Sequence, residues 1–434
     1  MYRHTENGHS NSEDFDFPTQ MKLNKNNRWI ILHSLIPWEK FEGEYAVLFS
    51  EKMGAPAKSF QMALGSLIIQ EVLKTTDRET IEQIQENPYL QYFLGLKSYQ
   101  EKAPFDASML VYFRKRINRK IIEKINKEIV NQGLENKAEK EDLSDEKKKE
   151  VIEIKNKGQL MSDASCIPAD IRYPTDLNLL NESRKITEKI IDKLYFPQKG
   201  KLIKKPRTDR KKARKAYLKV AKKKKVRRKE RRKAIKTQLK YTQRNLGYID
   251  ELISLGSSLK LLTKKEKKDL LVIREVWKQQ SKMYEENSHS IPHRIVSINQ
   301  PHIRPIVRGK AGAKVEFGSK VLISYVDGYV FLDHLNWESF NESKYLQFQI
   351  EKYQENFGYY PESVHVDQIY RTRENRKYCK ERNIRMSGPK LGRPRKNISL
   401  DEKKQAYNDQ LIRNRIEGKF GEGKRRYGLN LVRA

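Results

Sequence analysis

The fold of this 434-residue chain is decided by SVHVDQIYRTRENRKYCKERNIRM, which spans residues 363–386. Residues 363–366 favour a strand that ends at Asp367, because Gly358 and Pro361, which are typical of turns, come just before them. Residues 373–382 then favour a helix, and residues 384–386 favour a second strand. A helix between two strands is the repeating unit of α/β proteins, so we expect a sheet with helices packed on it.

The segments on either side continue this alternation of strands and helices. Apolar and polar residues alternate from residue 314 onward, and Asp327 with Gly328 predicts the tight turn of a β-hairpin. The remaining predicted elements are a strand at 159–166 and helices at 342–356 and 400–420. The expected fold class is therefore α/β.

Residues 1–135 are expected to form a helical N-terminal domain, because apolar residues recur there at helical spacing. The stretches 77–94 and 106–130 follow this period. The second of them carries Arg114 and Arg116, and several short helices with a basic one among them fit a helix-turn-helix reader of DNA. A plain helical bundle with a solvated basic face fits the same pattern.

Two highly charged segments come next. Residues 136–158 are almost wholly charged and predict either a solvated linker or an exposed helix end. Residues 176–300 predict long basic helices, with 22 Lys and Arg against two acids between residues 201 and 240. Thr263 and Glu266 have the spacing of a capping box at a helix start. Such helices would clamp a phosphate backbone without reading sequence, or form a solvated tail.

The overall charge indicates a polyanionic partner. The chain has 90 Lys and Arg against 56 Asp and Glu, a formal net charge of +34. DNA, RNA or a membrane surface would each satisfy that charge. No run of 18 apolar residues and no secretory signal is present, so we expect a cytoplasmic protein with no membrane span. Cys166 and Cys379 are isolated in sequence and predict buried, inert thiols.

Three acids stand where metal chemistry could use them. Asp163 lies in the first predicted strand, Asp367 ends a later strand, and Glu417 lies on the last helix. Two-metal phosphodiester cleavage needs hard oxygen ligands that converge from separate elements. Strand position alone does not single these acids out, because the chain offers four rivals: Asp170, Asp176, Asp333 and Glu338.

The last predicted helix gives a sharper pattern. Gln410, Arg413, Glu417 and Lys424 fall within about 60° of one helical face. That face would offer Glu417 to a metal and the two cations to phosphates. An ordinary amphipathic helix with a salt-bridged polar face fits as well, and two glycines leave open whether the helix reaches Lys424.

The pattern of Arg413, three residues, Glu417, six residues and Lys424 resembles the C-terminal signature of DDE transposases from bacterial insertion sequences, although Gln410 stands where that family usually has Tyr. Two further segments resemble the aspartate blocks of the insertion-sequence-5-like branch: Asp163 to Ser165 with residues 171–176, and residues 366–376. Residues 93–96 and 113–116 are similar to its helical N-terminal domain.

This resemblance implies an RNase H-like catalytic core made of residues 159–175 and 301–434. It implies that Asp163, Asp367 and Glu417 bind Mg²⁺ or Mn²⁺, and that water and then a DNA 3′-hydroxyl attack phosphorus during transposition. The partner would be double-stranded DNA, both element ends and target, bound by a homodimer in the nucleoid. The residues expected to contact DNA are Arg413, Lys424, Arg371, Arg373, Arg114 and Arg116.

Two alternatives stay open. The chain ends at Ala434, soon after Glu417, whereas family members usually continue through further helical sequence. It could therefore be a truncated, inactive copy of a transposase. It could also be a non-catalytic nucleic-acid-binding protein in which the basic helices do all the binding, with steep salt dependence and no metal requirement.

Overall fold

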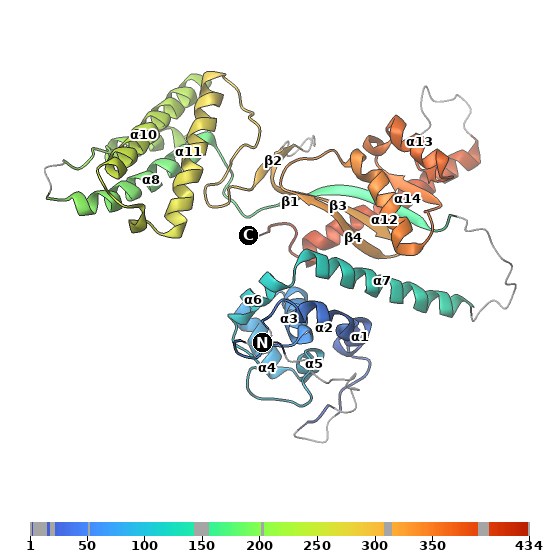
Figure 1. Ribbon diagram of the computed structural model, residues 1–434. Helices are drawn as coiled ribbons and strands as arrows, with labels where there is room; N and C mark the ends of the chain where they lie inside the picture. Colours follow the sequence, from blue (N-terminus) through green and yellow to red (C-terminus); the bar gives the residue numbers. More distant parts are fainter. Residues whose placement is uncertain are drawn as a thin grey trace. The chain divides into compact units, whose positions relative to one another are not determined.

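The computed structural model describes residues 2, 15–17, 22–50, 53–142, 156–200, 204–307, 315–388 and 399–432. The protein has a mixed α/β fold with one six-stranded sheet and many helices (Figure 1). The chain divides into two compact units, each described by itself below. The first comprises Met1–Asp163, Ile323–Asp333 and Ser343–Tyr427, and the second comprises Ala164–Leu322, His334–Glu342 and Gly428–Ala434.

The sheet places two parallel strands at its centre. Its strand order is β2-β3-β1-β5-β6, with β4 beside β3, and β5 runs parallel to both β1 and β6. The strands are β1 Gln159–Pro168, β2 Arg304–Val307, β3 Val315–Val326, β4 Tyr329–Asn336, β5 Ser363–Val366 and β6 Arg385–Met386. The predicted strand at 363–366 is confirmed at both ends, and the predicted strand at 384–386 is one residue shorter.

The predicted hairpin is also confirmed. Asp327 and Gly328 join β3 to β4, and their φ angles are 46° and 101°. A two-residue hairpin turn whose twist matches the strands needs positive φ at both central residues, which Asp and Gly tolerate better than most residues. Local sequence therefore fixes this connection.

The N-terminal part of the first unit is helical, as expected, but its helices are shorter than predicted. The predicted helix at 77–94 breaks where Asn87 caps a new helix that begins at Pro88, because a proline lacks the N–H needed inside a helix. The predicted helix at 106–130 breaks at Ile117, whose backbone is extended. The helices are α1 Arg28–Leu35, α2 Trp38–Ala46, α3 Phe60–Leu73, α4 Asp77–Glu86, α5 Pro88–Phe93, α6 Met109–Arg116 and α7 Arg119–Asp142.

Helix α7 runs into the segment predicted to be a linker or a helix end. It continues through Asp142, so the helical alternative is correct for residues 136–142. Residues 143–155 of that segment lie outside the described residues. The helices before α7 pack around a core that includes the aromatic side chains of Trp29, Trp38 and Phe93. The domain boundaries predicted from sequence stay predictions.

The second unit contains a bundle of four helices between β1 and β2. These are α8 Asp176–Tyr195, α9 Arg210–Ala221, α10 Arg228–Ser254 and α11 Lys264–Glu285, with short 3₁₀ turns at Phe196–Gln198 and Leu259–Leu261. Buried aliphatic side chains such as Ile190, Ile249 and Ile273 form its core. The capping box of Thr263 and Glu266 is confirmed at the start of α11.

The remaining helices of the first unit follow the hairpin. A 3₁₀ turn at Glu342–Tyr345 leads into α12 Leu346–Phe357, a second at Gln368–Tyr370 leads into α13 Arg373–Glu381, and α14 spans Leu400–Arg426. The helix expected at 400–420 therefore extends past Lys424. Among the described residues, none of the helices combines the length and the apolar character that crossing a bilayer requires.

A buried polar network ties α12 to the sheet. The Gln349 side chain accepts a hydrogen bond from the Ser162 hydroxyl of β1 at 2.5 Å, and its amide donates to Asp333 of β4 at 2.7 Å. Ser324 of β3 also donates to Asp333, whose other carboxylate oxygen lies 3.2 Å from Lys352 Nζ. Each buried polar group in this network has a hydrogen-bond partner within it. Removing one group would leave the others buried with fewer partners, so the network stabilises the fold only when it is complete.

We predict that Gln349→Ala lowers the free energy of unfolding by about 2 to 4 kcal/mol, because it leaves the Ser162 hydroxyl and the Asp333 carboxylate buried with fewer partners. Glu355→Ala, at an exposed position of the same helix, should change it by less than about 0.5 kcal/mol. Urea denaturation of the full chain measures both. Equal midpoints for the two variants would show that the network does not stabilise the fold.

Candidate active site

The register of β1 and β5 brings two of the predicted carboxylates to neighbouring positions. Ser162 pairs with Val366 in the parallel ladder, and Asp163 and Asp367 are the residues that follow each of them. Adjacent strands lie about 4.8 Å apart, so Asp163, within β1, and Asp367, directly after β5, occupy neighbouring positions. The backbone of Asp367 is still extended, with φ −68° and ψ 162°. Both aspartates therefore point away from the face that carries Ser162.

Arg413 links the third predicted carboxylate to the second. A single guanidinium nitrogen, Nη1, is hydrogen-bonded to Asp367 and lies 3.1 Å from Glu417 Oε1. The Arg413 side chain is only 19% exposed, whereas those of Asp367 and Glu417 are 52% and 53% exposed. The structure thus puts Asp367 and Glu417 within reach of one cationic atom on an open surface.

Helix α14 is fixed against the sheet by a second charged contact. Asp409 accepts two hydrogen bonds from Arg385 of β6, at 2.8 and 2.9 Å, and its Oδ1 lies 3.6 Å from Nδ1 of buried His365 in β5. Asp409 lies four residues before Arg413 and eight before Glu417, so all three share one side of the helix. Buried Ile416 adds apolar contact. These contacts hold Glu417 near the end of β5.

The site has donor chemistry that suits a hard cation. Carboxylate oxygens from separate elements are the ligands that Mg²⁺ and Mn²⁺ prefer. Among the described residues, however, no group of three or more Asp, Glu, His or Cys side chains is gathered closely enough to hold a metal ion. Arg413 takes the cationic position between Asp367 and Glu417 in this structure.

The four rival acids serve other contacts. Asp333 belongs to the network with Gln349, on the side of the sheet opposite Asp163. Asp176 pairs with Arg294, and Glu338 pairs with His293 and Arg304. Asp170 is exposed, and its backbone N–H donates to the Val432 carbonyl.

The other residues predicted to contact DNA differ in their exposure and in their contacts within the protein. Arg373 is exposed at the start of α13, while burial, together with the charge of Arg376, lowers the pKa of Arg371. Lys424 is half-buried near the end of α14. Arg114 forms an ion pair with Asp77, and Arg116 lies over the rings of Phe49 and Tyr112. Arg114 and Arg116 thus already have intramolecular contacts within the N-terminal helices.

The tyrosine nearest to Asp367 in sequence and both cysteines are buried. Tyr370, which follows Asp367 by three residues, is fully buried, and this disfavours a phenol attacking phosphate. Cys166 and Cys379 are buried, as predicted, and burial raises the pKa of Cys379 to about 11. Asp367 and Glu417, in contrast, are about half exposed.

Two protein families match parts of the chain. Residues 364–434 match a family described as a transposase DDE domain, and residues 17–116 match one described as a transposase domain (DUF772). The first match contains Asp367, Arg413 and Glu417, and the second contains Arg114 and Arg116. Together the two matches support a transposase of the DDE type from an insertion sequence.

One curated relative covers part of the chain. It is described as the uncharacterized protein ORF8 in the nfe locus of Rhizobium meliloti, and it is 32% identical over 113 residues. The matched stretch is 26% of this chain and 54% of the relative, so the chain spans about half the length of that protein. No solved structure matches the chain.

The contact between Asp409 and Arg385 predicts a dependence of stability on pH. Burial opposes ionisation of Asp409, but hydrogen bonds from Arg385 and Gln405 outweigh it and hold the pKa of this carboxyl below its usual value. The carboxylate therefore stabilises the fold fully above the unfolded pKa of about 4, and this contribution is lost as pH falls through the lower folded pKa.

We predict that Asp409→Asn destabilises the packing of α14 at pH 7 and that its difference from the parent chain shrinks as the pH falls below about 4. Amide hydrogen exchange in α14, followed from pH 3 to 7, measures this difference. Asp401→Asn, at an exposed position of the same helix, is the control. A difference that does not change with pH would contradict the ionised contact.

Proposed function

We propose that the protein is a DDE transposase that binds the ends of an insertion sequence and catalyses metal-dependent strand cleavage and strand transfer. One observation carries the proposal. The parallel register of β1 and β5 aligns Asp163 with Asp367, and Arg413 joins Asp367 to Glu417. The two transposase matches, at opposite ends of the chain, support it.

The catalytic core would be RNase H-like. In such a core the first two acids stand on adjacent parallel strands and the third comes from a later helix, which is the arrangement of β1, β5 and α14 here. The resemblance of residues 366–376 to the second aspartate block favours the insertion-sequence-5-like branch. The four-helix bundle between β1 and β2 would be an insertion into this core.

Asp163, Asp367 and Glu417 would hold Mg²⁺ or Mn²⁺, because their carboxylates supply the hard oxygen ligands that such ions need. When bound, such ions activate the attacking water or 3′-hydroxyl and stabilise charge on the leaving oxygen. Arg413 offsets part of the negative charge of Asp367 and Glu417 while no metal is bound. These carboxylates can then stay close to each other without strong mutual repulsion.

The partner would be double-stranded DNA. Arg373, Lys424 and, once released from the carboxylates, Arg413 would bind phosphates beside the site, with Arg371 positioning the segment after Asp367. The N-terminal helices, with Arg114 and Arg116, would bind the element ends. We further propose a homodimer on paired ends, in the cytoplasm and associated with the nucleoid.

We predict that Asp163→Asn, Asp367→Asn and Glu417→Gln each reduce Mg²⁺-dependent strand cleavage and transfer at least a thousandfold while duplex binding in EDTA persists. The substrate is a duplex carrying the DNA that flanks the coding frame. Glu381→Gln, at an exposed acid at the end of α13 and outside residues 366–376, is the matched control and should keep parental activity. Cleavage retained by one of the three variants would remove that residue from the site.

The same assay separates the two alternatives. A truncated, inactive copy would bind the flanking DNA specifically but would not cut it with Mg²⁺ or Mn²⁺. A non-catalytic binder would bind flanking and unrelated duplexes equally, with steep salt dependence and no cleavage. Specific binding of the flanking DNA together with its cleavage is the result expected only of an active transposase.

A further inference from the structure

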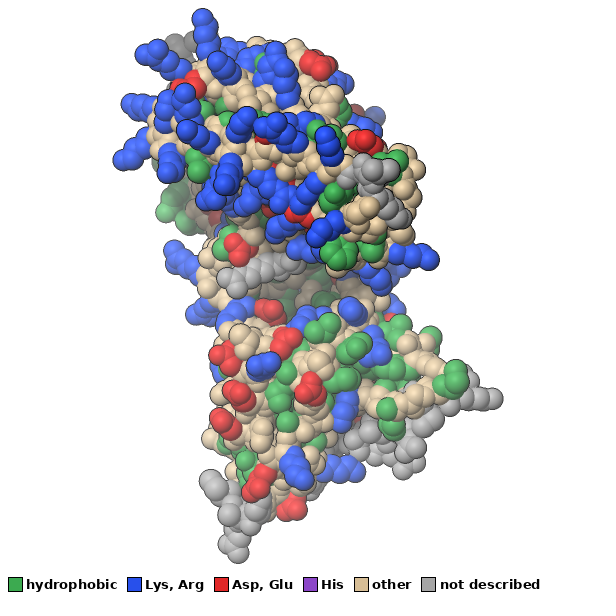
Figure 2. Space-filling model, turned by 90° about the vertical axis from the view of Figure 1, so that its left-hand side faces the viewer, with side chains coloured by type: hydrophobic (Ala, Val, Ile, Leu, Met, Phe, Trp, Pro, Cys, Tyr) green, Lys and Arg blue, Asp and Glu red, His purple; other side chains and the backbone are tan. Residues whose placement is uncertain are grey.

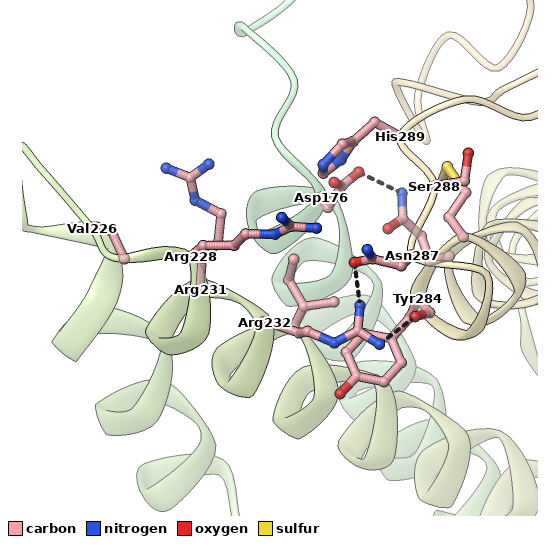
Figure 3. Close-up of a pocket in the computed structure, with 12 residues that line it drawn as sticks. Asp176, Val226, Arg228, Arg231, Arg232, Tyr284, Asn287, Ser288 and His289 are labelled. Carbon is pink, nitrogen blue, oxygen red and sulfur yellow. Dashed lines mark hydrogen bonds between the residues drawn. The ribbon is translucent and has the colours of Figure 1, made fainter.

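The helical bundle of the second unit has a basic pocket of about 480 Å³ on its surface. The pocket is lined by the starts of α8 and α10 and by the end of α11 with the loop that follows. Figure 3 shows Arg228, Arg231 and Arg232 of α10 on one side, and Tyr284 and Asn287 on another. The lining therefore brings three guanidinium groups to one recess.

Arg232 is held in place as part of the pocket wall. Its Nη1 donates to Asn287 Oδ1 at 2.9 Å, and its Nη2 donates to the Tyr284 carbonyl at 2.8 Å (Figure 3). Its guanidinium also lies over the Tyr284 ring, 4.1 Å from the centroid. A side chain fixed by three contacts has little rotamer entropy left to lose when a ligand binds.

The acid in the pocket is already neutralised. Asp176 Oδ1 accepts hydrogen bonds from Gln280 Nε2 at 2.9 Å and from Arg294 Nη2 at 2.7 Å. Its negative charge is therefore compensated by Arg294. The pocket keeps the positive charges of its three α10 arginines in excess.

Arg228 and Arg231 differ from most arginines of the bundle. Arg184, Arg210 and Arg244 pair with Glu188, Asp192 and Asp209, respectively. The side chains of Arg228 and Arg231 have no hydrogen bond or ion pair within the described part of the chain. They stand three residues apart on α10, so they are neighbours on one face. Two unpaired planar guanidinium groups at this spacing suit the oxygens of a phosphodiester.

The pocket opens within a strongly basic surface. Figure 2 faces the bundle and shows its surface crowded with Lys and Arg side chains. The exposed lysines of α9 and of the turn into α10 include Lys211, Lys212, Lys215, Lys219, Lys222 and Lys224. Asn287 Oδ1 and Gln280 Nε2 are already bonded to Arg232 and Asp176. The unpaired guanidinium groups remain available to phosphate oxygens, contacts that carry no sequence information.

We propose that this pocket seats a backbone phosphate of duplex DNA and that the bundle is a sequence-indifferent DNA-binding surface in its own right. Arg228 and Arg231 bind the phosphate, and Arg232 forms part of the pocket wall through its contacts with Asn287 and Tyr284. The inference rests on the proposed function only in taking duplex DNA as the polyanion. A surface that binds DNA of any sequence is suited to target DNA, whose sequence changes from one insertion to the next.

The test measures duplex binding by the full chain in EDTA, where no cleavage occurs, over a range of salt concentrations. Arg228→Gln/Arg231→Gln should weaken binding about tenfold, equally for flanking and unrelated duplexes. Because two phosphate contacts are lost, the slope of log affinity against log salt should fall by about 2. Arg228→Lys/Arg231→Lys keeps both charges and should restore most of the slope.

Lys264→Gln/Lys267→Gln is the matched control, since it removes the same charge at the start of α11. The pocket joins the start of α10 to the end of α11, so these lysines lie at the other end of the bundle, roughly 30 Å away. Equal loss in the control and in the pocket variant would overturn the phosphate seat. So would an unchanged slope in the arginine-to-glutamine variant.

Failure of this inference differs from failure of the proposed function. If the parent chain binds no duplex at all, DNA is not the partner and both proposals fail. If the parent binds and cuts flanking DNA while the pocket variant binds as the parent does, only the pocket is wrong. Thermal unfolding of each variant, expected within about 2 °C of the parent, shows that the bundle is folded.

Discussion

The hydrogen-bonded register between β1 and β5 sets the geometry on which the candidate site depends. In a parallel ladder the side chains of both strands alternate in step, and one register places Asp163 and Asp367 side by side. A shift by one residue would send one aspartate to the opposite face. The network of Ser162, Gln349 and Asp333 lies behind the aspartates and ties α12 to β1 and β4, so it resists such a shift.

Charge balance completes the arrangement that the strands begin. The carboxylates of Asp367 and Glu417 repel each other, and Arg413 offsets part of that repulsion by contacting both through one nitrogen. Four residues before Arg413 on the same helix, Asp409 binds Arg385 and keeps α14 against the sheet. One helix therefore carries the third acid, a cation that balances it and an anchor that positions both.

Local patterns in the sequence were sufficient for the elements that local chemistry determines. The strand at 363–366, the turn at Asp327 and Gly328 and the capping box at Thr263 each depend on a few neighbouring residues. The spacing of apolar residues was not sufficient to locate helix ends, because the same spacing continues through the break between helices at Pro88. It also could not identify the partners of Asp409 or Asp333, which come from strands and helices distant in sequence. The resemblance chose Asp163, Asp367 and Glu417, whereas the register and the Arg413 contacts give a physical reason for that choice.

The central claim is that these three acids share one divalent metal site. Anomalous scattering from a crystal of the full chain soaked in Mn²⁺ tests it most directly. The account predicts density between Asp163 and Asp367, with oxygens of both and of Glu417 at about 2.0 to 2.3 Å and with Arg413 displaced from its present position. Density elsewhere, or an Arg413 that still joins Asp367 to Glu417 at saturating Mn²⁺, would contradict it.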